Sequence, residues 1–158
     1  MADIFEFTLT LDLRDAVSEE ELTELRWHLG LGPRPERLRL VTAFPCVRVD
    51  EDGAPVVDDC PEPLLGRRGE AWKVGGTLVS ALRRREGAGG GGWALTSRQE
   101  LHPDEFERAG ELLGRLAARA GEGHRRPDGG IVLGTTRFHA SERAEPLVVR
   151  DGVVGWPS

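Results

Sequence analysis

Apolar and polar residues alternate strictly from residue 5 to residue 13. The apolar positions are Phe5, Phe7, Leu9, Leu11 and Leu13. Successive side chains of a strand point to opposite faces of the sheet, so this period of two predicts a strand with one buried face. The polar side chains of the same strand should then lie on the opposite face of the sheet.

A helix is predicted to follow from about residue 19. Ser18 and Glu21 have the spacing of a capping box, in which each side chain binds the backbone amide of the other residue. The leucines at positions 22, 25 and 29 fall on one face. Gly30 is suited to the left-handed residue that ends a helix, and two prolines soon after it prevent continuation.

The next stretch is less regular. Leu38, Leu40 and Thr42 alternate with arginines, which predicts a second strand returning beside the first. From about residue 50 to residue 76, glycine and proline interrupt short apolar pairs, so we expect an irregular excursion within one domain spanning residues 1–158.

The second half of the chain predicts a hairpin, a helix and further strands. Residues 77–85 and 93–101 flank a glycine run and are predicted to be the two arms of a hairpin, with a helix as the alternative for the first arm. A helix with one apolar stripe should start at Pro103 and stop at Gly121. A strand over 131–140 and a short hairpin on the Asp151-Gly152 turn complete the chain.

These elements predict an α+β fold. Two helices with one apolar stripe each cannot cover both faces of a sheet, so we expect a two-layer sandwich with a mostly antiparallel sheet and both helices on one face. The pattern is similar to ferredoxin-like folds and to dimeric α+β barrels. The resemblance is one of architecture and implies no activity.

Composition narrows the class of protein. The chain has 158 residues, of which 39% are hydrophobic and 30% charged, with a net charge of −6. The first 60 residues carry −8 and the rest +2, and an acidic half argues against a nucleic-acid partner, whose phosphates need clustered cations. No apolar run is long enough to span a membrane and no signal peptide is evident, so we expect a cytoplasmic protein without a membrane partner. The preference for arginine over lysine is typical of a GC-rich bacterial gene.

The sequence predicts neither a cofactor nor a metal site. Gly87, Gly89 and Gly92 match a dinucleotide-binding pattern, but strand-like residues follow them where that motif needs a helix. The four histidines are scattered singly. Cys46 and Cys60 lack metal-ligand spacing, and we expect two reduced structural thiols. Glu24 and His28 should form a solvated pair near the end of the first helix.

One group of polar residues could form a ligand site. If the odd positions of the first strand are buried, Glu6 should share the opposite sheet face with Arg98, Arg137 and His139. In a monomer this is an ordinary solvated sheet face. In a homodimer closing over it, the arginines could hold a small anionic ligand and His139 could serve as a general acid or base.

Trp27 is the second candidate. It lies opposite the leucine stripe of its helix, so its ring should be exposed as an anchor for a partner unless the loop through Pro33 and Pro35 covers it.

Of the two functions that remain, we favour a non-catalytic protein-binding module, because it needs fewer coincidences among residues. The alternative is a homodimeric small-molecule-binding protein or enzyme that uses the polar sheet face.

Overall fold

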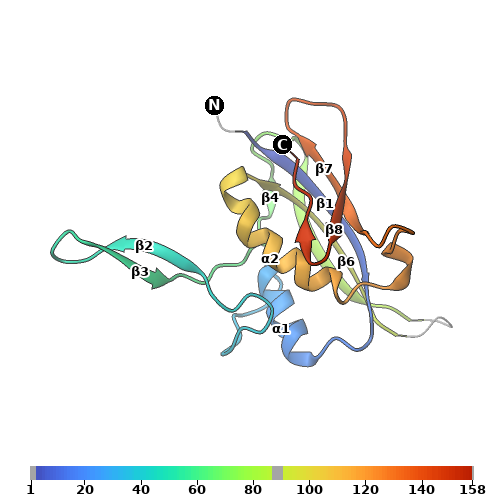
Figure 1. The fold of residues 1–158 in the computed structure, drawn as a ribbon, viewed down its shortest axis with the longest axis horizontal. Coiled ribbons are helices and arrows are strands. Elements are labelled where there is room, and N and C mark those ends of the chain that lie inside the picture. Colours follow the sequence, from blue (N-terminus) through green and yellow to red (C-terminus); the bar gives the residue numbers. More distant parts are fainter. Residues whose placement is uncertain (1–2, 87–90, 158) are drawn as a thin grey trace.

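The protein consists of a body of helices and strands, from which a long two-stranded ribbon projects (Figure 1). We describe a computed structural model, in which residues 3–86 and 91–157 are placed. The main sheet has seven strands in the order β4-β5-β6-β1-β7-β8-β9, and β2 and β3 form a separate sheet. The strands are β1 (Phe5–Leu13), β2 (Pro45–Val49), β3 (Pro55–Asp59), β4 (Gly69–Glu70), β5 (Thr77–Arg84), β6 (Trp93–Leu101), β7 (Ile131–Phe138), β8 (Glu145–Arg150) and β9 (Val153–Val154). All their pairings are antiparallel.

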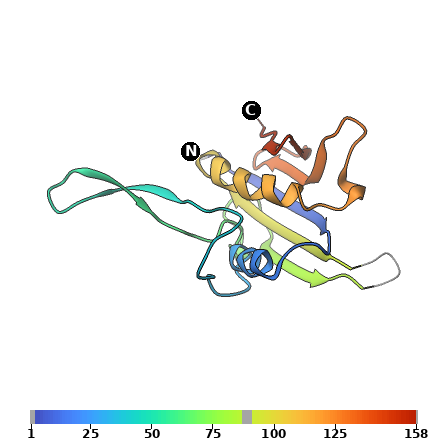
Figure 2. The same ribbon diagram turned by 60° about the horizontal axis from the view of Figure 1, so that its bottom comes forward.

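Two α-helices, α1 (Glu19–His28) and α2 (Phe106–Ala117), cover one face of the main sheet (Figure 2). Short 3₁₀ turns, η1 (Pro103–Glu105) and η2 (Glu122–His124), flank α2. The core lies between the helices and β1, whose residues Phe7, Leu9, Leu11 and Leu13 are at most 1% exposed. The α+β class, the antiparallel sheet and the buried face of β1 are therefore as the sequence predicts.

Local signals for the helices also hold. The Ser18 hydroxyl accepts the amide of Glu21 and the Glu21 carboxylate accepts the amide of Ser18, each at 3.2 Å, which completes the capping box. Gly30 follows α1 with a φ of +72°. Between β8 and β9, Asp151 and Gly152 both have positive φ, as a tight hairpin turn on Asp-Gly requires.

The predicted second strand is absent. Residues 37–44 take no regular structure, although Leu40, Val41 and Phe44 are buried. The first main-sheet strand after α1 is the two-residue β4, which pairs with β5, and β5 in turn pairs with β6. The segment that we expected to be irregular, 50–76, contains β3 and β4. The tip of the β5–β6 hairpin, residues 87–90, lies outside the described residues.

The register of β7 changes at one point. Val132 pairs with Val148, but the next pair is Gly134 with Leu147, so Leu133 is an extra residue in a bulge. Leu133 is fully buried, and Val132, which alternation alone would place inside, is not part of the core. Gly134 has a φ of +157° and lies against the backbone of β1, where a Cβ atom would be 1.8 Å from the carbonyl oxygen of Thr8.

Candidate functional site

The β2–β3 ribbon is the most prominent feature of the surface and extends away from the body (Figures 1 and 2). Its strands pair in register, with Val47 opposite Val57 and Val49 opposite Pro55. Directly opposed residues of an antiparallel pair share a face. These four side chains therefore form one apolar face, which we call the valine face.

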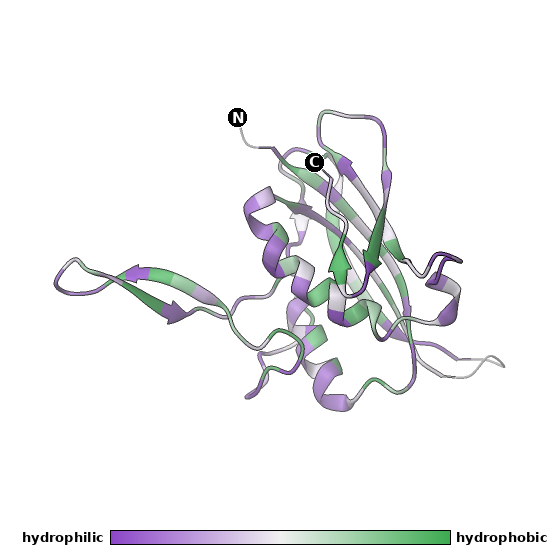
Figure 3. Cartoon of the chain, in the orientation of Figure 1, coloured by the Kyte–Doolittle hydropathy of each residue, from purple (hydrophilic) through white to green (hydrophobic). Residues whose placement is uncertain are grey.

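The valine face is open to solvent. The exposed fractions are 72% for Val47, 71% for Val49 and 76% for Val57. The colouring in Figure 3 shows this hydrophobic stretch on the projecting ribbon, away from the core. On the opposite face, Arg48 and Asp58 form an ion pair with 3.5 Å between Nε and Oδ2.

The far end of the ribbon is a turn held by Asp50. Its carboxylate accepts the amides of Asp52 and Ala54 at 2.9 and 2.8 Å, and the Asp50 amide donates to the Ala54 carbonyl at 3.0 Å. Gly53 supplies the positive φ of +79° that the turn requires. This end carries Asp50, Glu51 and Asp52, so the ribbon combines an apolar face with an acidic tip.

A disulfide closes the other end. Cys46 is bonded to Cys60, with 6.0 Å between their Cα atoms. The prediction of two reduced thiols is therefore wrong in this structure. Its physical cause is the ribbon, which folds the chain back so that residues 14 apart in sequence become neighbours. The pattern that could have revealed this is the pair of short valine-containing runs on either side of the turn at 50–54.

Phe44 anchors the base of the ribbon in the core. Its side chain is fully buried and lies 6.2 Å, ring centroid to centroid, from Trp27 and from His28. Its backbone binds β3 and the residue after it: the Phe44 amide donates to the Asp59 carboxylate at 2.7 Å, and its carbonyl accepts the Cys60 amide at 2.7 Å. The ribbon therefore leaves the body from a fixed starting point.

A buried carboxylate holds the segment that leads into the ribbon. Glu24 of α1 is fully buried, and its two oxygens accept the successive amides of Arg39, Leu40 and Val41. The Glu24 carboxylate also lies close to His28, with 3.1 Å between Oε2 of Glu24 and Nε2 of His28. Our expectation of a solvated pair is wrong, because residues 37–44 and 64–65 fold over this side of α1.

The protonation of Glu24 follows from these contacts. Burial by itself would raise the pKa of the Glu24 carboxyl, but the hydrogen bonds from His28 and from the amides of residues 39–41 lower it below its ordinary value. Glu24 is therefore an ionised group inside the protein. Its negative charge is offset by donors from the backbone and from one imidazole.

Trp27 does not provide the exposed ring that an interface anchor needs. It is only 7% exposed and its ring packs on His28, at 4.7 Å between centroids, and on Phe44. The side of α1 opposite its leucines is covered by the irregular chain that leads to the ribbon. Trp27 thus supports the ribbon from below, and the exposed apolar residues lie on the ribbon itself.

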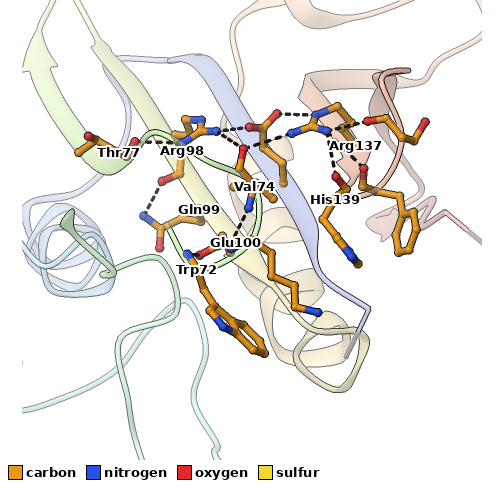
Figure 4. A network of polar contacts seen from close by, with 12 residues as sticks. Trp72, Val74, Thr77, Arg98, Gln99, Glu100, Arg137 and His139 are labelled. Atoms are coloured by element: carbon orange, nitrogen blue, oxygen red, sulfur yellow. Dashed lines mark hydrogen bonds and ion pairs between the residues drawn. The ribbon is translucent and has the colours of Figure 1, made fainter. Parts of the chain in front are cut away.

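The polar sheet face brings together three of the four residues proposed for a ligand site (Figure 4). Glu6 is central: it pairs with Arg98 on one side, and its Oε1 lies 3.4 Å from Nε of Arg137 on the other. In the sheet, Glu6 lies opposite Arg137 on β7, and Arg98 lies opposite the neighbouring Thr8. The two guanidinium groups thus share one carboxylate.

A loop from the β4–β5 connection lies over this group. The carbonyl oxygen of Val74 is 3.5 Å from Nη2 of Arg98 and 3.4 Å from Nη2 of Arg137 (Figure 4). Glu100, which is 4% exposed, fixes the loop by accepting the amides of Trp72, Lys73 and Val74 at 2.6, 2.7 and 3.1 Å. Burial would raise the pKa of Glu100, but these amides and the nearby Arg67 lower it.

His139 lies apart from this charge cluster. Its Nδ1 is 3.2 Å from both the amide nitrogen and the carbonyl oxygen of Ile4, at the start of β1. The backbone carbonyl of His139, not its ring, accepts from Arg137. The imidazole is therefore engaged with the backbone, and its acid–base role stays a prediction.

The remaining sequence patterns have these outcomes. Within residues 3–86 and 91–157, no three His, Cys, Asp or Glu side chains converge as metal ligands, and no helix is long and apolar enough to cross a membrane. Gly87 and Gly89 of the glycine run lie outside the described residues, and Gly92 leads directly into β6.

No family model, curated protein or solved structure matches this chain.

Proposed function

We propose that this chain is a non-catalytic protein-binding module whose partner docks on the valine face of the β2–β3 ribbon. The observation that carries the proposal is the exposure of Val47, Val49 and Val57, each above 70%, on an element that projects from the body. Contiguous apolar side chains on a protein surface commonly mark sites of association. A two-stranded ribbon also has two free strand edges, to which a partner strand can add.

The supports at both ends of the ribbon favour binding. The Asp50 turn, the Cys46–Cys60 disulfide and the buried Phe44 restrain the ribbon before any partner arrives. A surface that is already ordered loses less conformational entropy on binding than a disordered one. The restraint therefore raises the affinity that a small apolar face can provide.

Charge indicates the chemistry of the partner. Residues 45–62 contain six acidic residues and one arginine, and the exposed carboxylates of Glu51 and Asp52 lie at the tip. Complementary charge speeds encounter and selects among partners. We therefore propose a basic protein surface with an apolar strip, and binding that weakens as ionic strength rises.

The alternative, a homodimeric small-molecule site on the polar sheet face, has less support. Arg98 and Arg137 already bind Glu6 and the Val74 carbonyl, so an anionic ligand would have to displace both. Losing the partner of a part-buried charge costs free energy that the ligand must supply. The alternative thus requires an opening of the 72–76 loop that protein binding through the ribbon does not.

We further propose that the body is a ferredoxin-like fold extended at both sheet edges. Its elements β1, α1, β5, β6, α2 and β7 follow the order of that fold, and the four strands lie in the order β5-β6-β1-β7 with antiparallel neighbours.

The cytoplasmic location expected from the sequence stays a proposal. The disulfide argues against a strongly reducing compartment, where such bonds rarely persist.

The test uses capture followed by reconstitution. The immobilised protein first captures its partner from host extract. The partner is then identified, purified without a tag and titrated against wild type and the variant Val47→Thr/Val57→Thr. Threonine keeps the β-branched shape but places a hydroxyl in the interface, so we expect affinity to fall about tenfold. Val153→Thr, at a site that is 69% exposed on β9, is the matched control. Equal affinity for all three proteins would contradict the proposal.

A further inference from the structure

A hollow floored by aromatic rings lies away from the ribbon, where β1 and β7 meet the start of α2. Its volume is about 580 Å³, within the range of small-molecule sites. The rings of Phe5, Phe106 and Phe138 line it, and Pro103 and Pro157 extend its apolar wall. None of residues 45–59 lines it, so this site and the valine face are separate surfaces.

The three phenylalanine rings are held in a fixed arrangement. Phe5 lies at the centre, 5.4 Å from Phe106 in an edge-to-face contact and 5.3 Å from Phe138, between ring centroids. Trp156 stacks on Phe106 at 4.2 Å and supports it. All three phenylalanines are nevertheless only half-buried, so a ring entering the hollow would remove apolar surface from water and add aromatic contacts.

Charges of both signs surround the aromatic floor. Arg143, Asp3 and Glu145 line the hollow, and all three are exposed. Within the described part of the chain, none of these three side chains has an ion-pair partner. Arg137 also lines the hollow, but its guanidinium is already shared with Glu6.

This combination selects a class of ligand. A simple aromatic acid would meet Arg143 but also two carboxylates, and a simple aromatic amine would meet the carboxylates but also Arg143. A zwitterion matches both signs. We propose that the hollow binds a free aromatic α-amino acid, with its ring on the phenylalanine floor, its carboxylate at Arg143 and its ammonium at Asp3 and Glu145.

Calorimetric titration with three related probes tests the proposal. L-Phenylalanine has the ring and both charges, 3-phenylpropionate lacks the ammonium, and 2-phenylethylamine lacks the carboxylate. We expect L-phenylalanine to bind more tightly than either analogue. Saturation-transfer NMR, which tolerates weak binding, should place its ring protons in contact with the protein.

Two variants at exposed rim positions assign the charges without touching the core. Arg143→Gln should weaken L-phenylalanine about fivefold, the upper range for an exposed ion pair, and should tighten 2-phenylethylamine, which no longer meets a like charge. Asp3→Asn/Glu145→Gln should weaken L-phenylalanine and should tighten 3-phenylpropionate, which no longer meets two like charges. Arg34→Gln, an exposed arginine outside the hollow, is the control. The proposal is overturned if L-phenylalanine does not bind at millimolar concentration, if the analogues bind equally well, or if the rim variants bind like the control.

Discussion

Two buried carboxylates explain how long irregular segments take a defined path. Glu24 accepts three successive amides of residues 39–41, and Glu100 accepts three of residues 72–74. Backbone amides that have no partner in a helix or sheet must be satisfied in another way. In this protein a single side chain satisfies three of them at once, and it fixes a loop in doing so.

Replacing Glu24 should therefore be costly. Glu24→Gln removes the charge that three amides and His28 stabilise, and it presents an amide NH₂ where only donors face it. We expect the free energy of unfolding to fall by about 3 kcal/mol, the range for breaking a buried charged group's network. Urea denaturation measures it. Glu19→Gln, an exposed change in the first turn of the same helix, should lie within about 0.5 kcal/mol of wild type.

The same carboxylates predict how stability depends on pH. The pKa values of Glu24 and Glu100 are lowered in the folded protein, so the unfolded chain takes up protons first as pH falls. Their contribution is complete above the ordinary glutamate pKa of about 4.5 and is lost as pH falls through their folded values. Unfolding curves at a series of acidic pH values should show the gap between wild type and Glu24→Gln closing. A gap that stays constant down to pH 3 would refute this assignment.

Thr136 offers an opposite test, in which a substitution should stabilise the protein. Its hydroxyl is buried and has no hydrogen-bond partner among the described residues. Thr136→Val keeps the branched shape and removes a group that costs roughly 1–3 kcal/mol to bury unpaired. We expect a gain of about 1 kcal/mol by urea denaturation. Thr135→Val, at the adjacent exposed position, should change the unfolding free energy little.

At the scale of elements, strong local patterns predicted well. The alternation in β1, the capping box of α1, the stripe of α2 and the Asp151-Gly152 turn all appear where the sequence places them. Each of these signals depends on residues close in sequence. The alternation of Leu38, Leu40 and Thr42 predicted a strand that is absent, because the amides of Leu40 and Val41 bind a distant carboxylate. The Leu133 bulge depends on packing against β1.

The ribbon was missed for a related reason. Its strands are five residues each and face solvent on both sides, so the alternation of Val47, Arg48 and Val49 is too short to predict a strand by itself. Its order comes from cross-strand pairs, the Asp50 turn and the disulfide. The elements that the sequence predicts least clearly are thus those that depend on contacts outside the core.

The disulfide should stabilise the ribbon more than the body. The pair Cys46→Ser/Cys60→Ser removes the link at its base, while Phe44 and the main sheet keep their packing. We expect amide hydrogen exchange to quicken across residues 45–59 and to stay unchanged in β1 and β6. Exchange that quickens equally in the whole sheet would show instead that the bond supports the global fold.

For the whole molecule, the polar sheet face of the body and the valine face of the ribbon are two chemically different surfaces. The sequence places Glu6, Arg98 and Arg137 on one sheet face, and the structure brings these three side chains together. The sequence could not show that these charges neutralise one another or that the 72–76 loop covers them, because those contacts join segments far apart in the chain. The valine face of the ribbon, in contrast, is exposed and apolar and has a fixed support.

The most direct test of protein binding through the ribbon is a hydrogen-exchange footprint of the chain with and without its purified partner. We predict slower exchange in residues 45–59 of the complex, with little change in β6, β1 and β7. Protection confined to those three strands, with the ribbon exchanging as in the free protein, would contradict the account and favour a site on the polar sheet face.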